Sequence, residues 1–129
     1  MEKQSRRLTI IDDDDGVRGA LRVLFQVLEY DVTAHSSAEA YLASEAPIPD
    51  CLLIDLELDG MSGVDAVGYL QSAGRLGPTI IMTGSRNTDL LRRARRSAAD
   101  LVMPKPLDPD QLESEVARLS ALTRKVLCE

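Results

Sequence analysis

The sequence predicts an α/β fold in which a doubly wound parallel sheet of five strands alternates with five helices. Short apolar runs of strand length alternate along the chain with segments of helical periodicity. Four of the apolar runs end in polar residues, and the run at 51–54 is apolar at every position. A continuously apolar strand is typical of a parallel sheet that is covered on both faces, because neither side of the strand meets water.

The strands are expected at residues 8–12, 31–35, 51–54, 79–82 and 101–103. The segment 31–35 alternates polar and apolar residues, as an edge strand does, whereas the first, third and fourth strands are more apolar. Parallel neighbours need crossover connections, and these connections are right-handed. Together these features favour the flavodoxin-like strand order 2-1-3-4-5, which places the half-polar second strand at an edge.

Helical segments follow each strand, and their apolar residues recur at helical spacing. These residues are Val17, Leu21, Leu24, Phe25 and Leu28; Tyr41 and Leu42; Val64, Val67 and Leu70; Leu90, Leu91, Ala94 and Ala98; and Leu112, Val116, Leu119, Leu122 and Val126. Asp15 is expected to cap the first helix and Asp108 the last. The spacing of Ser36 and Glu39 predicts a capping box at the second helix.

Length and apolar content favour one domain that spans 1–129, with a tail at 1–6. Residues 120–129 either begin a linker or extend the last helix. The net charge is −6, which argues against direct nucleic-acid binding by this domain. Because the chain has neither a membrane span nor a signal-peptide core, we expect a cytoplasmic protein without membrane contact. Cys51 is expected as a buried thiol and Cys128 as a tail thiol, not as a disulfide.

Polar residues that could take part in catalysis or metal binding follow four of the predicted strands. Acids at 12–15 follow the first strand, Asp55 the third, Thr83 the fourth and Lys105 the fifth. The carboxyl ends of parallel strands meet at one edge, so we expect these side chains to share a rim. Converging carboxylates repel each other unless a cation neutralises them, and oxygen ligands suit Mg²⁺ or Mn²⁺. The sequence therefore predicts a divalent metal at this edge.

These motifs resemble the receiver domain of two-component response regulators over about residues 7–122. The pattern D-x-x-x-x-G-x-x-G at Asp55, Gly60 and Gly63 adds to the resemblance, and so does the pair Lys105-Pro106. The run at 78–84, Pro-Thr-Ile-Ile-Met-Thr-Gly, is most similar to the nitrogen-fixation-type subfamily.

The resemblance implies that Asp55 accepts a phosphoryl group in a Mg²⁺-dependent reaction. Such a domain catalyses its own phosphorylation and dephosphorylation without being a conventional turnover enzyme. Thr83 is then expected to donate a hydrogen bond to the phosphoryl group, and Lys105 to neutralise its charge. The family's Lys-Pro bond is usually cis, which implies a cis bond between Lys105 and Pro106.

The resemblance also implies the metal ligands and the partners. Asp13 and Asp55 are expected to bind Mg²⁺ through their side chains, Glu57 through its backbone carbonyl and Asp12 through water. The implied phosphodonor is a sensor histidine kinase or a phosphotransfer protein. The implied output is a partner protein, an attached effector domain or a phosphorylation-dependent homodimer.

Two departures from the family concern signalling. Val102 stands where the family usually has a switching aromatic residue, and Leu107 replaces the usual aromatic residue after Lys-Pro. The segment 86–96 contains five arginines and only one acid, Asp89. This excess of positive charge favours a contact surface for a partner. His35, the only histidine, is expected at the surface.

Two alternative functions remain open at this stage. One is a protein-interaction module that has the receiver fold but is not phosphorylated. The other is a phosphatase of the haloacid-dehalogenase type, which also uses Mg²⁺ and an Asp at the end of a strand. That family has Asp two residues after its nucleophile, whereas this chain has Glu57.

Overall fold

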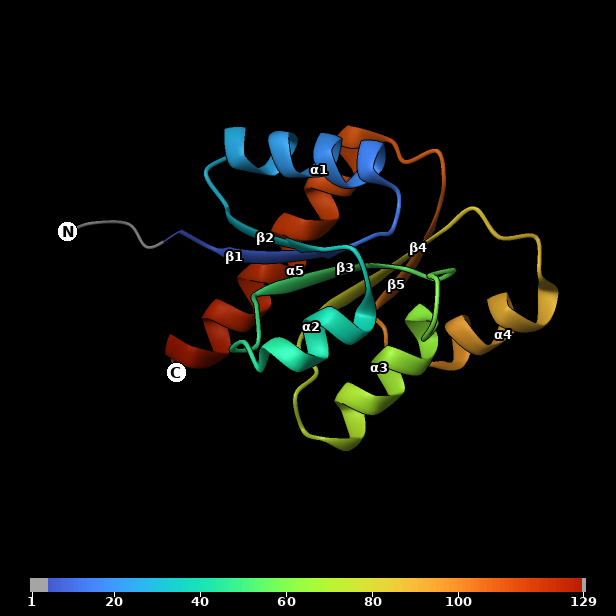
Figure 1. Cartoon of the computed structure of the whole chain (residues 1–129). Coiled ribbons are helices and arrows are strands. Elements are labelled where there is room, and N and C mark those ends of the chain that lie inside the picture. The colour runs from blue at the N-terminus through green and yellow to red at the C-terminus, as the bar shows by residue number, and fades with distance from the viewer. Residues whose placement is uncertain (1–4, 129) are drawn as a thin grey trace.

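Five parallel strands form a single sheet in the order β2-β1-β3-β4-β5, which confirms the predicted fold (Figure 1). The computed structural model describes residues 5–128, with side chains described through residue 122. The strands are β1 (Arg7–Ile11), β2 (Asp31–His35), β3 (Cys51–Asp55), β4 (Thr79–Thr83) and β5 (Leu101–Pro104). As predicted from its alternating pattern, β2 lies at an edge.

Helices cover both faces of the sheet. They are α1 (Asp15–Val27), α2 (Ala38–Ser44), α3 (Gly63–Ser72), α4 (Thr88–Arg96) and α5 (Pro109–Cys128). Figure 1 shows α1 and α5 on one face and α2, α3 and α4 on the other. Part of the predicted tail at 1–6 lies outside the described residues, so the predicted domain limits stay a prediction. No helix in the described part of the chain has the length and apolarity needed to cross a membrane.

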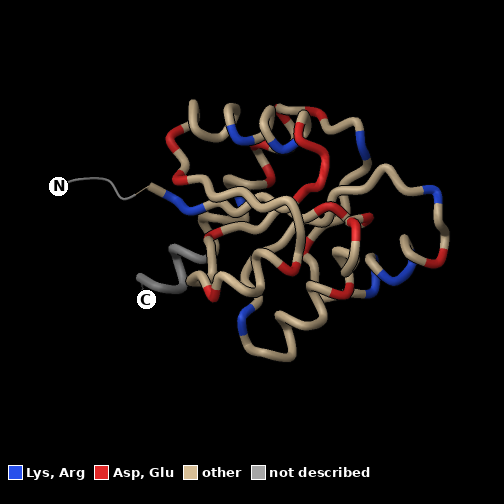
Figure 2. The backbone as a smooth tube through the Cα atoms, in the orientation of Figure 1, with Lys and Arg blue, Asp and Glu red and all other residues tan. Residues whose placement is uncertain are grey.

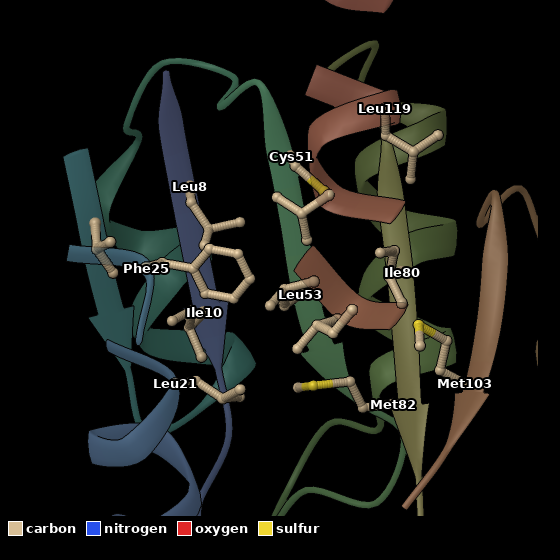
Figure 3. Packing of buried hydrophobic residues seen from close by; sticks show 13 residues of the cluster. Leu8, Ile10, Leu21, Phe25, Cys51, Leu53, Ile80, Met82, Met103 and Leu119 are labelled. Atoms are coloured by element: carbon tan, nitrogen blue, oxygen red, sulfur yellow. The ribbon is translucent and has the colours of Figure 1, made fainter. Parts of the chain in front are cut away.

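The central strand, β3, contributes side chains to two hydrophobic cores, one on each face of the sheet. Cys51 and Leu53 of β3 pack with α1 and α5, and Figure 3 shows this cluster around the sheet. Leu52 and Ile54 point to the other face and pack with α2 and α3. Because side chains alternate along a strand, a strand that is apolar at every position is buried on both faces. The burial of β3 fixes Asp55 at the point where the strand leaves the core.

The start of α1 differs from the prediction by one residue. Asp14, not Asp15, is the N-cap: its Oδ1 accepts hydrogen bonds from the backbone N–H groups of Gly16 at 2.8 Å and Val17 at 3.1 Å. Asp14 has the extended backbone that an N-cap requires, whereas Asp15 already lies in the helix and pairs with Arg18. The prediction at α5 is confirmed, since Asp108 accepts from the N–H of Asp110.

Other expectations also need correction. Ser37, not Ser36, caps α2 and accepts from Ala40 N–H. Leu122, expected on the apolar stripe of α5, is 49% exposed, because it lies two residues after the fully buried Ser120 and so points away from it. His35 reaches the surface only in part: it is half-buried against the ring of Tyr41, and burial lowers its pKa.

The cysteine prediction is tested at one position. Cys51 is free and fully buried in β3, as expected, and burial raises the pKa of its thiol to about 12. The structure does not describe the side chains of Cys128 and Val126, so the expectations for these two residues stay predictions.

Candidate functional site

The predicted polar residues meet at the carboxyl edge of the sheet. Asp12 directly follows β1, Asp55 ends β3, Thr83 ends β4 and Lys105 directly follows β5. The strands are parallel and paired in register, with Asp55 beside Met82 and Thr83 beside Pro104. Consequently, residues that are up to 93 positions apart in sequence lie within hydrogen-bonding distance.

Lys105 joins two of the acids. Its Nζ donates a hydrogen bond to Asp12 Oδ2 at 3.0 Å and another to Asp55 Oδ2 at 3.2 Å. Burial by itself would lower the pKa of Lys105, but the hydrogen bonds and charges of the two carboxylates outweigh it and raise the pKa. The amine is therefore a stable cation at neutral pH. The bond between Lys105 and Pro106 is cis, as the resemblance implied.

Asp55 carries charge that its surroundings compensate only in part. Burial, and then the charge of Asp12, raise the pKa of Asp55 from 3.8 to about 6, although Lys105 opposes both effects. Asp12 is fully buried and Asp55 is 7% exposed, so water screens their repulsion poorly. One ammonium group does not neutralise this site.

The acid cluster fits a divalent cation. Carboxylate oxygens of Asp12, Asp13 and Asp55 lie within 4.8 Å of one another. Oxygen ligands at this spacing suit Mg²⁺ or Mn²⁺, and a second positive group would relieve the repulsion that raises the pKa of Asp55. Among the described residues, the Glu57 side chain is not part of this cluster, and the role of its backbone carbonyl stays a prediction.

Gly63 permits close packing behind Asp55. A Cβ at Gly63 would lie 2.3 Å from the backbone oxygen of Asp55, which no side chain allows. The N–H of Gly63 donates to the carbonyl of Leu56 at 2.9 Å, so α3 begins directly against the end of β3. The first glycine of the motif, Gly60, has a φ of 82° and forms the turn of the loop. Both glycines therefore have structural reasons to be glycine.

Thr83 is buried, and its hydroxyl oxygen accepts a hydrogen bond from the N–H of Ser85 at 2.9 Å. The hydroxyl of Ser85 in turn donates to the Glu57 carboxylate, across the mouth of the site. This bridge joins the loop after β4 to the loop after β3. Ser85 was not among the residues predicted for the site, although it lies two residues after Thr83 in a polar loop.

Arg18 was also missed. Its guanidinium donates to the backbone carbonyl of Asp12 at 2.8 Å and pairs with Asp15. It therefore holds the acidic loop to the first turns of α1. Its spacing of three residues from Asp15 suits a helical ion pair, which was the available signal.

Comparison with known proteins identifies the family. The family model for the response regulator receiver domain matches residues 8–117, most of the chain. The chain belongs to the response regulator receiver domain family. All the residues of the acid cluster, together with Thr83 and Lys105, lie inside the matched receiver region.

Curated relatives include nitrogen-fixation and nodulation regulators. Transcriptional regulatory protein FixJ of Azorhizobium caulinodans is 33% identical over 106 residues, covering 81% of this chain and 50% of the relative. Nodulation protein W of Bradyrhizobium diazoefficiens is 31% identical over 120 residues, covering 90% and 52%. These relatives support the nitrogen-fixation-type resemblance. The chain spans about half the length of the curated relatives it matches.

Solved receiver structures have the same fold. A CheY-like receiver domain from Methanospirillum hungatei superposes with a TM-score of 0.86 at 21% identity, covering 95% of this chain and 98% of that one. The crystal structure described as FIXJ-N has a TM-score of 0.79 at 28% identity, covering 92% and 96%. The comparisons do not favour a phosphatase of the haloacid-dehalogenase type.

Proposed function

We propose that this receiver domain accepts a phosphoryl group on the carboxylate of Asp55. The observation that carries the proposal is the contact of one lysine amine with both Asp55 and Asp12 inside a cluster of three acids. Asp55 lies at the end of a buried strand, so its carboxylate is held in place. Phosphoryl transfer depends mainly on positioning and on neutralising charge, and this site supplies both.

In the proposed reaction, a carboxylate oxygen of Asp55 attacks the phosphorus of the donor. A P–O bond forms as the P–N bond of a phosphohistidine breaks, and the released imidazole takes up a proton. With acetyl phosphate, the P–O bond to acetate breaks instead. Lys105 already contacts Asp55 and is placed to neutralise charge on the transferred group. The hydroxyl of Thr83 would donate a hydrogen bond to a phosphoryl oxygen.

The cation would be held by the side chains of Asp13 and Asp55, by the backbone carbonyl of Glu57, and through water by Asp12. When bound, it supplies positive charge for the phosphoryl oxygens and lowers the repulsion among the carboxylates. The Thr83 hydroxyl oxygen can keep accepting from the N–H of Ser85 while its O–H donates to a phosphoryl oxygen, because a hydroxyl has one donor and two acceptor positions. A shift of Thr83 towards the phosphoryl group would therefore pull on Ser85 and, through the bridge between Ser85 and Glu57, carry the change into the loop before α4.

The proposed phosphodonor is a histidine kinase or a phosphotransfer protein in the cytoplasm. The proposed receiver of the signal is an output protein, an attached effector domain or a second copy of the chain. Val102 is half-buried against α4 and the other core residues of that face. Because Val102 has no ring to reorient, we infer that the signal passes through the loop at 83–87 to α4.

The surface of α4 is suited to an acidic partner. Figure 2 shows the basic residues of α4 close together at one side of the molecule, on a chain whose net charge is −6. Thr88 and Leu91 line a hollow of about 240 Å³ together with Arg92, Arg95 and Arg96. Arg93 pairs with Asp65 of α3, which ties α4 to its neighbour. The remaining arginines would speed and direct the encounter with an acidic surface.

Intact-mass measurement tests the phosphorylation. Wild type incubated with acetyl phosphate and Mg²⁺ should gain the mass of one phosphoryl group, and Asp55→Asn should not. Asp59→Asn removes a neighbouring acid as a matched control and should still gain the mass. A wild type that never gains mass would favour the interaction module that is not phosphorylated.

A further inference from the structure

The loop at 56–62, which connects β3 to α3, is held from outside by several side chains. Its Glu57 accepts from Ser85, and the N–H of Asp59 donates to Asp13 Oδ2 at 3.2 Å. A third contact comes from α2: Glu39 Oε2 accepts the N–H of Met61 at 3.0 Å. The first two contacts involve residues of the proposed site. Glu39 has no part in the proposed chemistry, so its contact requires another explanation.

Glu39 fits the turn of the loop closely. A Cβ at Gly60 would lie 2.3 Å from Glu39 Oε2, so the carboxylate occupies the space that a side chain at position 60 would need. Gly60 has a φ of 82°, where glycine is favoured. The turn therefore presents both an open backbone surface and a free N–H to the carboxylate. In Figure 1, the beginning of α2 lies next to the loop that follows β3.

The contact is not a by-product of helix capping. The spacing of Ser36 and Glu39 predicts a capping box, but Ser37 is the N-cap and uses its own hydroxyl on Ala40 N–H. The Glu39 carboxylate crosses to the loop instead. The hydrogen bond from Met61 N–H is the main cause that lowers the pKa of Glu39, followed by its own N–H. Glu39 is therefore ionised at neutral pH and makes a charge-assisted hydrogen bond.

We propose that Glu39 is a positioning residue that holds the turn at 59–61. It would thereby limit the movement of the Glu57 carbonyl, which would bind the cation, and keep the N–H of Asp59 on Asp13. The cation-binding role rests on the proposed function. Met61 lies four residues after Glu57, and between them the chain also contacts Asp13. Fixing the far end of so short a segment limits the positions available to the Glu57 carbonyl.

The first test uses the metal-free protein and does not depend on phosphorylation. Glu39→Ala should speed hydrogen exchange of the Met61 and Asp59 amides severalfold, as measured by NMR. Glu39→Gln should leave exchange close to wild type, because its amide oxygen still accepts the hydrogen bond. Glu45→Ala, which removes an acid at the other end of α2, serves as the matched control and should change neither amide.

The second test is a Mg²⁺ titration by calorimetry. Loss of an outer partner of a metal site weakens metal binding about tenfold or more, and for this exposed contact we expect about a three- to tenfold loss in Glu39→Ala. Glu39→Gln should recover most of the affinity. Saturating Mg²⁺ should restore the rate of phosphorylation by acetyl phosphate in Glu39→Ala, because the reacting groups are unchanged.

Two results would overturn the proposal: unchanged amide exchange in Glu39→Ala, or faster exchange with unchanged Mg²⁺ affinity. The latter would leave Glu39 as a structural contact only. If wild type and all variants bind Mg²⁺ but none gains a phosphoryl group, the proposed function fails while the positioning role stands.

Discussion

Replacing Asp55 by Asn should stabilise the metal-free domain at neutral pH. The buried carboxylate has a pKa raised from 3.8 to about 6, first by burial and then by Asp12. The folded state therefore binds the proton more tightly than the unfolded state. Proton binding to Asp55 therefore stabilises the folded state. This contribution is complete below about pH 3.8, the unfolded pKa, and is lost as the pH rises through about 6, the folded pKa. Above that pH, folding must bury a charge that Asn does not carry.

The size of the effect follows from the two pKa values. Each pH unit between them corresponds to about 1.4 kcal/mol, so ionised Asp55 lowers the free energy of unfolding by about 3 kcal/mol at neutral pH. The pKa of about 6 already includes the favourable contact with Lys105. Asn keeps the size of the side chain and an oxygen that can accept from Lys105. We therefore expect Asp55→Asn to gain about 2–3 kcal/mol.

Urea unfolding in EDTA, followed by circular dichroism, measures this gain. The difference between Asp55→Asn and wild type should be full at about pH 7.5 and roughly half as large at about pH 5. Mg²⁺ should reduce this difference in unfolding free energy, because it stabilises the wild type. Asp31→Asn, at the opposite edge of the sheet, is the control for a general effect of lost charge. A less stable Asn variant at about pH 7.5, or a difference independent of pH, would refute the reasoning.

Three further predictions concern the metal, α4 and the core thiol. Mg²⁺ at about 100 times its dissociation constant should stabilise wild type by roughly 2.7 kcal/mol and raise its melting temperature by several degrees, and Asp13→Ala should lose most of the rise. Sedimentation of the phosphorylated protein should show association that weakens with salt and with Arg92→Glu/Arg96→Glu; unchanged association in both comparisons would leave these arginines as ordinary surface charge. In a Cys128→Ser background, Cys51 should react with a thiol reagent only on unfolding, whereas rapid labelling of the native protein would contradict its burial.

The fold and the meeting of the acids with Lys105 were predictable because their signals are local. The strands of the site, β1, β3, β4 and β5, are short and mainly apolar, and the residue that ends or follows each one marks the carboxyl edge. Once the strands are parallel, Asp12, Asp55 and Lys105 must lie at one rim whatever their separation in sequence.

The cap of α1 was not predictable to the residue. Four consecutive acids at 12–15 can all cap a helix, and only the backbone conformation selects Asp14. Similarly, Glu39 satisfies the spacing of a capping box, but a longer-range contact with Met61 competes for the same carboxylate. The bridge between Glu57 and Ser85 depends on how two loops face each other, and neither loop has a sequence pattern that specifies its partner.

The account depends most on the identity of the phosphoacceptor. Wild type phosphorylated by acetyl phosphate in Mg²⁺ can be trapped by borohydride reduction of the acyl phosphate, and the modified peptide sequenced by tandem mass spectrometry. The account predicts the modification at Asp55 alone, at the end of β3. Modification at Asp12 or Asp13 with Asp55 intact would contradict it.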